Sequence, residues 1–209
     1  VVLLLTGSAA VLSQQLPTLP GKSKATQPEK PKPAPVSKPR TGVEKLKPNY
    51  ENYTKAELEN LVHGGNTAAL YELGNRYFLD GEYKAAINYF ISAYQETKNY
   101  RAAFMLSYCY YMGLGTEKNY ESTAGWANLA ANYNYAPALY RLGVLYNEGL
   151  GVSQSNSDAD IYFKRAYDII SNKLESRLDE WEKWTIGVMY DVGYYIAKNE
   201  AKAFQWYQK

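Results

Sequence analysis

The chain has 209 residues and a formal net charge of +2, with one Cys and one His. This length suffices for one or two domains with a hydrophobic core, whereas a single Cys and a single His exclude an intrachain disulfide framework and metal sites built from several Cys or His. Residues 1–53 hold 8 Lys or Arg against 3 Asp or Glu, and residues 54–209 hold 15 against 18. Because the basic excess lies in the N-terminal segment, the sequence offers no basic folded face for nucleic acid.

The first predicted segment, residues 1–13, contains the apolar run VVLLLTGSAAVL. The run is too short to cross a bilayer but suits the hydrophobic part of a signal peptide, and its small residues offer cleavage sites. We therefore expect a partial signal peptide and a bacterial protein that is exported to the periplasm or cell envelope. A retained inner-membrane anchor is the alternative. The last stretch, FQWYQK, has no helix-stop signal, so we also expect the sequence to be a piece of a longer chain.

Residues 14–53 form a segment rich in Pro and Lys. Eight of the nine prolines lie at or before Pro48, around PEKPKPAPVSKP. Because proline fixes φ and lacks a backbone donor, we expect a disordered, extended linker that acts as a spacer. Contact with an acidic surface, or service as a Pro-rich ligand, is the alternative.

A short helix is predicted at residues 54–65. Thr54 and Glu57 have the spacing of a capping box, and Gly64 is a stop signal. His63 near the helix end is explained by the helix dipole. We expect this helix to cap the array that follows.

Residues 66–209 contain four similar units, at about 66–98, 99–134, 135–170 and 177–209. Each has an apolar signature residue followed by a small residue and, four positions after the signature residue, by a Tyr. The signature residues are Leu73, Leu106, Leu142 and Ile186. This spacing places the signature residue and the Tyr on one face of a helix. A second apolar pattern with an aromatic anchor follows in each unit, so each unit is predicted to be a helical hairpin.

The connectors between the paired helices also recur, as GLGTEKN, GLGVSQSN and GYYIAKN. Glycine is expected to end the first helix, and Asn119, Ser157 and Asn199 are expected to cap the second. An insertion, IISNKLESRLDE, separates the third and fourth units. It is predicted either to lengthen the flanking helices or to form a protruding elbow.

The glycine pairs of these connectors, together with the signature residues, resemble Sel-one-like repeats, which are longer-looped relatives of tetratricopeptide repeats. The pairs are Gly113 with Gly115 and Gly149 with Gly151, and in the last unit Tyr195 takes the second place. The resemblance implies an all-α fold, an α-solenoid of stacked antiparallel helix pairs. It also implies a concave face, lined by the first helices, that binds protein segments.

Candidate partner-binding residues were sought at the positions expected to face this groove. They are Asn75, Phe78, Tyr108, Tyr111, Arg141, Asn147 and Asp191. Amide and aromatic side chains suit an extended peptide, and the same rings suit a glycan. We expect replacement of Tyr108 or Tyr111 by Ala to weaken partner binding with little effect on stability. An aromatic residue also lies two positions before each signature residue. We expect this set to pack between helices, with ligand contact as the alternative; its members are Tyr71, Phe104, Tyr140 and Trp184.

No catalytic constellation or cofactor motif is recognised. The acidic pairs fall near helix starts, where they complement the dipole, and Cys109 falls mid-helix among tyrosines, as a buried inert thiol does. The sequence thus predicts a non-catalytic protein–protein interaction scaffold or adaptor of the cell envelope, without cofactors or metals, that binds an extended partner segment. The alternatives are a cell-wall or exopolysaccharide-binding module and a cytoplasmic scaffold.

Overall fold

The computed structural model describes residue 50 and residues 52–209. The chain divides into two units, residues 1–38 and 39–209, and every described residue belongs to the second. The expectations for residues 1–13 and for nearly all of 14–53 therefore concern residues outside the described part.

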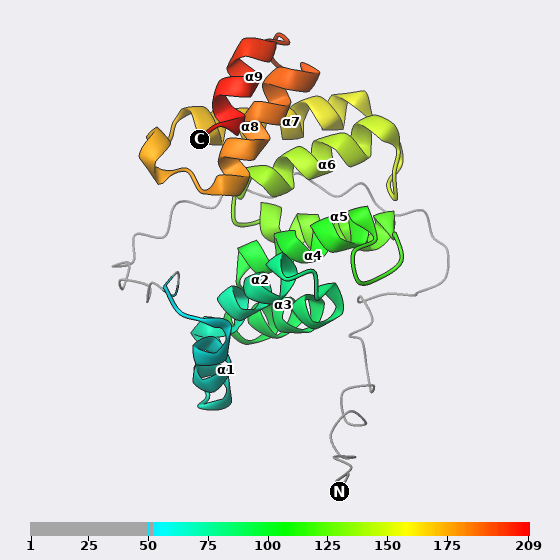
Figure 1. Cartoon of the computed structure of the whole chain (residues 1–209). Coiled ribbons are helices and arrows are strands. Elements are labelled where there is room, and N and C mark those ends of the chain that lie inside the picture. Colours follow the sequence, from blue (N-terminus) through cyan, green and yellow to red (C-terminus); the bar gives the residue numbers. More distant parts are fainter. Residues whose placement is uncertain (1–49, 51) are drawn as a thin grey trace, which may run out of the picture. The chain divides into compact units, whose positions relative to one another are not determined.

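Helices make up the regular structure of residues 52–209 (Figure 1). They are α1 (Lys55–His63), α2 (Leu70–Leu79), α3 (Tyr83–Thr97), α4 (Tyr100–Met112), α5 (Tyr120–Ala131), α6 (Ala136–Glu148), α7 (Asn156–Ser171), α8 (Glu180–Val192) and α9 (Glu200–Tyr207), with short 3-10 turns at Thr67–Ala69 and Glu175–Arg177. The pairs α2/α3, α4/α5, α6/α7 and α8/α9 pack as hairpins, and each hairpin packs on the next. The predicted all-α solenoid of stacked helix pairs is confirmed.

The predicted helix ends agree with the structure at most positions. Thr54 and Glu57 form the capping box of α1. Gly113, Gly149 and Gly193 end α4, α6 and α8 with left-handed backbone, at φ of 76°, 68° and 87°. Glycine adopts this region without the steric cost that a Cβ brings, which explains its recurrence.

One predicted cap was wrong. Asn119 and Asn199 cap α5 and α9, but the cap of α7 is Ser155, whose hydroxyl accepts a hydrogen bond from the Asp158 amide. Ser157 lies inside the first turn. Each N-cap follows the glycine that ends the preceding helix by the same interval, so the Gly-to-cap spacing specifies Ser155.

The signature residues form the centre of the solenoid, where Leu73, Leu106 and Leu142 are fully buried. The small residue beside each lets a ring from the second helix approach: a Cβ on Gly143 would meet the Phe163 ring at 2.5 Å. The substituted Ser107 satisfies its buried hydroxyl by donating to the Thr123 carbonyl at 3.0 Å. The small residues are therefore explained by the close packing of the second helix against the first, and not by backbone flexibility.

The insertion between the third and fourth units has both expected effects. Helix α7 extends to Ser171, and residues 172–179 then form an elbow that includes the turn Glu175–Arg177 before α8 begins at Glu180. The elbow delivers Asp179 to the N-cap of α8, in a capping box with Glu182.

Candidate partner-binding site

Four rings from three of the first helices form a continuous line, which we call the aromatic row: Phe78, Tyr108, Trp181 and Trp184. Consecutive ring centroids lie 6.1, 5.0 and 5.9 Å apart. Trp181 of α8 contacts Tyr108 of α4, although α6 comes between these two helices in the chain. The first helices of the hairpins therefore share one side of the stack, which we call the inner face. Trp184 is the most exposed member, at 38%.

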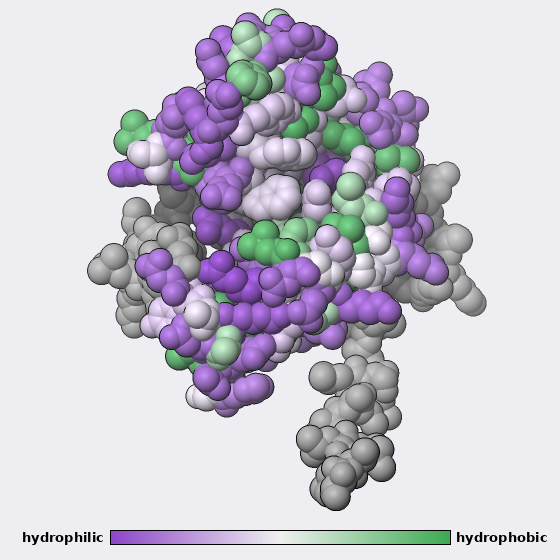
Figure 2. Space-filling view, viewed as in Figure 1, coloured by the Kyte–Doolittle hydropathy of each residue, from purple (hydrophilic) through white to green (hydrophobic). Residues whose placement is uncertain are grey.

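Figure 2 shows the surface on this side of the helices. Residues of intermediate hydropathy gather in the middle of the view with hydrophobic residues beside them, and hydrophilic residues cover much of the rest of the visible face. An aromatic centre with a polar margin is the usual composition of a protein–protein interface.

Arg141 of α6 lies beside the aromatic row. Its guanidinium carbon is 3.9 Å from the ring centroid of Tyr111 and 5.9 Å from that of Tyr108. The residue is 6% exposed, and burial lowers its pKa below the ordinary arginine value. Stacking on the two rings stabilises the charge by a cation–π interaction.

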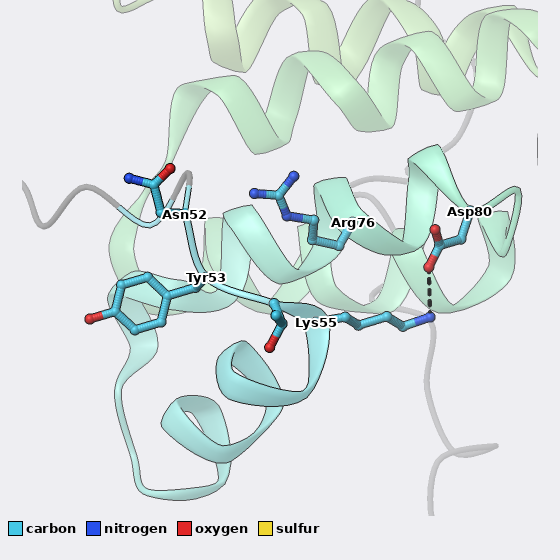
Figure 3. Close-up of a pocket in the computed structure, with 6 residues that line it drawn as sticks. Asn52, Tyr53, Lys55, Arg76 and Asp80 are labelled. Carbon is cyan, nitrogen blue, oxygen red and sulfur yellow. Dashed lines mark hydrogen bonds and ion pairs between the residues drawn. The ribbon is translucent and has the colours of Figure 1, made fainter.

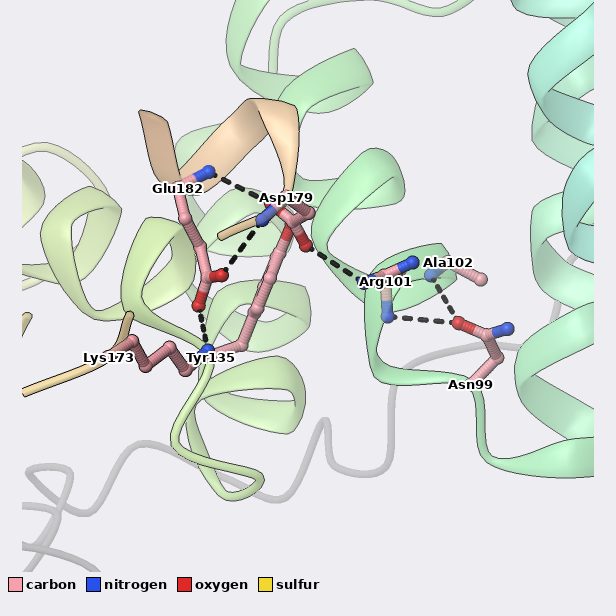
Figure 4. A network of polar contacts seen from close by, with 7 residues as sticks. All are labelled: Asn99, Arg101, Ala102, Tyr135, Lys173, Asp179 and Glu182. Carbon is pink, nitrogen blue, oxygen red and sulfur yellow. Dashed lines mark hydrogen bonds and ion pairs between the residues drawn. The ribbon is translucent and has the colours of Figure 1, made fainter. Parts of the chain in front are cut away.

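A polar network fixes the elbow against earlier repeats (Figure 4). Asp179 accepts from the Tyr135 hydroxyl at 3.1 Å and forms an ion pair with Arg101 at 3.2 Å. Glu182, which is 2% exposed, closes the capping box and also pairs with Lys173. Because Asp179 is two residues before Trp181, this network places the central ring of the row.

The sequence-predicted residues divide into two groups. Phe78, Tyr108, Tyr111 and Arg141 are brought together on the inner face by the ring contacts described above. Three others lie outside that cluster. The Asn147 amide donates to the Tyr194 hydroxyl at 3.4 Å, Asp191 accepts from the Tyr207 hydroxyl at 3.5 Å, and Asn75 is half-buried on α2.

Tyr108 and Tyr111, which were expected to face the groove and to be replaceable with little effect on stability, are both half-buried. The Tyr111 ring also contacts Tyr120 of α5, with centroids 5.7 Å apart. Replacement of either ring by Ala thus removes packing as well as binding surface. Trp184, which makes fewer ring contacts, is the better probe of binding.

The four aromatic residues that lie two positions before the signature residues differ in burial. Phe104 and Tyr140 are buried, as the packing interpretation predicts, and Tyr71 is half-buried with its pKa raised by burial. Trp184 instead reaches the surface.

Sequence reasoning missed Trp181. The sequence does carry one signal: this position holds an aromatic residue in the fourth unit alone, whereas the equivalent residues of the other three units are Ala68, Arg101 and Pro137.

A hollow of about 350 Å³ lies where α1 meets α2 (Figure 3). Lys55 crosses it to pair with Asp80 at 3.0 Å, and it also pairs with Glu82. These two ion pairs join the start of α1 to the first repeat.

Cys109 and His63 lie where the sequence analysis placed them, in the middle of α4 and at the end of α1. Cys109 is fully buried, and burial raises the pKa of its thiol to about 12, so the thiolate is scarce near neutral pH. His63 occupies the last turn of α1. Within the described part of the chain, no helix combines the length and apolarity needed to span a membrane, and no group of three or more His, Cys, Asp or Glu is placed to hold a metal ion.

Comparison with known proteins identifies the repeats. The Sel1 repeat family model matches residues 67–97, 101–132, 136–168 and 186–209. A protective antigen present in uropathogenic Escherichia coli strains, which displays an SLR fold, is 25% identical with a TM-score of 0.54, over 75% of this chain and 32% of that one. A Sel1 repeat protein from Oxalobacter formigenes is 26% identical with a TM-score of 0.47, over 66% and 53%. The chain thus spans about a third and about half of these two proteins.

Proposed function

The chain belongs to the Sel1 repeat family, whose members generally mediate protein–protein interaction, and we propose that it is a non-catalytic adaptor that binds an extended segment of a partner protein on its inner face. The aromatic row carries this proposal. It offers large, rigid rings in a line across three repeats, with one ring, Trp184, still 38% exposed. A line of rings suits a strand-like segment better than a compact ligand.

The glycan alternative is disfavoured by the ring geometry. Sugar stacking needs an open ring face, but the row packs its rings edge-on or tilted, at 65°, 58° and 75° between successive planes. Neighbouring rings therefore cover part of each face. Peptide side chains can contact exposed edges, so this arrangement favours protein.

A crosslinking experiment tests the proposal in cells. One copy of the full-length protein carries a photo-crosslinking residue at Trp184 on α8, and a control copy carries it at Ile161, which is 45% exposed on the outer helix α7. We expect one protein to be captured from Trp184 and not from Ile161. Its purified form should lose binding to Trp184→Ala and keep binding to Ile161→Ala. Capture of a sugar polymer, or equal capture at both positions, would contradict the proposal.

A cell-envelope location is part of the proposal, supported by the apolar run in residues 1–13 and the Pro- and Lys-rich segment after it. In this arrangement the linker would separate the repeats from the membrane or from an N-terminal partner. Protease added to bacteria with a permeabilised outer membrane should digest the repeats while a cytoplasmic marker survives. Protection of the repeats until the inner membrane is broken would place the protein in the cytoplasm.

A further inference from the structure

Arg141 holds a charge that the inner face does not neutralise. Its Nε is buried and has no hydrogen-bond acceptor. No carboxylate among residues 52–209 lies within ion-pair distance of it, whereas Arg101 contacts Asp179 and Arg76 contacts Glu72. The groups around the guanidinium are tyrosines: the rings of Tyr108 and Tyr111, the Tyr111 hydroxyl, with which the Arg141 side chain interacts, and Tyr140.

The burial of this charge raises the free energy of the folded protein when no partner is bound. A cation removed from water loses hydration, and two aromatic rings restore only a part of it. The pKa of Arg141 is lowered for the same reason, since burial opposes its charged form and outweighs the neighbouring tyrosines, which act to raise the pKa. An arriving carboxylate would supply both the missing charge and an acceptor.

The surroundings indicate what kind of molecule brings the carboxylate. Large apolar side chains stand exposed at the equivalent last position of α2, α4 and α8: Leu79 at 67%, Met112 at 45% and Val192 at 49%. In α6 this position holds the exposed Glu148. The three apolar residues belong to the same helices as the aromatic row. A ligand that uses both needs apolar groups spread over several repeats, as an extended polypeptide has and a small anion lacks.

Resting on the proposed function, we propose that the partner is an extended polypeptide segment in which an internal Asp or Glu side chain pairs with Arg141 while flanking apolar side chains contact the aromatic row. A phosphorylated segment is disfavoured, because a phosphate calls for several cations and Arg141 stands without a second Lys or Arg in the contacts described above. The chain's own residues 1–53 are also a poor match, since they are predominantly basic.

A peptide selection tests this inference. The full chain and its Arg141→Gln variant are each screened against random dodecapeptides displayed on phage through their C-termini, so that every carboxylate is a side chain. Binders are kept only if they compete with crosslinking at Trp184. We expect the wild type to enrich Asp or Glu at one internal position and the variant to lose that enrichment. The selected peptide should bind the wild type at least tenfold more tightly than its Gln or Asn analogue does.

A second measurement guards against a variant that does not fold. In the ¹⁵N-labelled wild-type protein, the Arg141 Nε–Hε signal is assigned by its loss in Arg141→Lys. The selected acidic peptide should shift this signal saturably, and its neutral analogue should leave it in place. Circular dichroism and thermal melting report whether each variant is folded.

The outcomes separate this inference from the proposed function. Binders without an acidic residue, an acidic preference that persists in a folded Arg141→Gln variant, or an unmoved Nε–Hε signal would overturn the pairing and leave the adaptor proposal intact. If no displayed peptide competes at Trp184, both proposals fall. A peptide that binds only as a soluble free acid, through its terminal carboxylate, would also overturn the side-chain pairing.

Discussion

Trp181 of α8 packs on Tyr108 of α4 with ring centroids 5.0 Å apart and ring planes inclined at 58°. The contact joins the fourth repeat to the second, past α6. In a simple stack each repeat contacts its neighbours alone, so this ring adds a longer-range tie. It also completes the aromatic row, which makes Trp181 important both for stability and for the inner surface.

Replacement of Trp181 by Ala should lower the free energy of unfolding by about 2–3 kcal/mol, somewhat less than a fully buried aromatic because the residue is half-buried. The loss arises from its contacts with Phe104 and Tyr108. Urea denaturation followed by circular dichroism measures it. Ile161→Ala, on the exposed side of α7, is the matched control, and a similar loss in both variants would contradict the role assigned to Trp181.

Asp179→Ala should destabilise the protein by about 1–3 kcal/mol, because it removes the cap of α8 and leaves the Tyr135 hydroxyl without its acceptor. The neighbouring Glu180 is exposed, and Glu180→Ala should change stability by less than about 0.5 kcal/mol. Thermal melting of the two variants checks the difference. Equal melting temperatures would show that the network at the elbow contributes little.

Gly151→Ala should be more harmful than Gly65→Ala, although both glycines have positive φ, 68° and 86°. The backbone conformation alone costs an Ala about 1–2 kcal/mol at either site. A Cβ at Gly151 would also meet the Tyr120 backbone at 2.3 Å, whereas one at Gly65 meets nothing within 4 Å. Chemical denaturation of both variants separates the two effects, and an equal loss would mean that the connector moves aside freely.

Cys109 should react slowly with a thiol reagent in the native protein and rapidly in urea. Burial raises its thiol pKa from 9.0 to about 12, so its contribution to stability is complete below pH 9 and is lost as the pH rises toward 12. The unfolding free energy of Cys109→Ala should fall less steeply over that range. A residual slope is expected, because burial also raises the pKa of Tyr140. Rapid native labelling would show that the thiol is accessible.

Much of the fold followed from the sequence, because the signals for it are local. Helical spacing identified Leu106 and its equivalents as core, and the glycines that need left-handed backbone marked where the first helices end. The same periodicity gave the number of hairpins and their order. The prediction of Ser157 as the cap was wrong because Ser153, Ser155 and Ser157 lie close together, and the spacing from Gly149 is what distinguishes Ser155.

The inner face depended on the tertiary structure. The sequence selected Phe78, Tyr108, Tyr111 and Arg141, but it could not reveal that Arg141 is buried against the Tyr111 ring with no carboxylate of residues 52–209 within ion-pair distance. It also did not predict Trp181, since the contact of that ring with α4 joins residues far apart in the chain, as does the ion pair of Asp179 with Arg101 at the elbow. Local spacing determines which helices form and where they end. The contacts between residues far apart in the chain depend on how the repeats are rotated on one another, and that rotation was decided by packing across the whole stack.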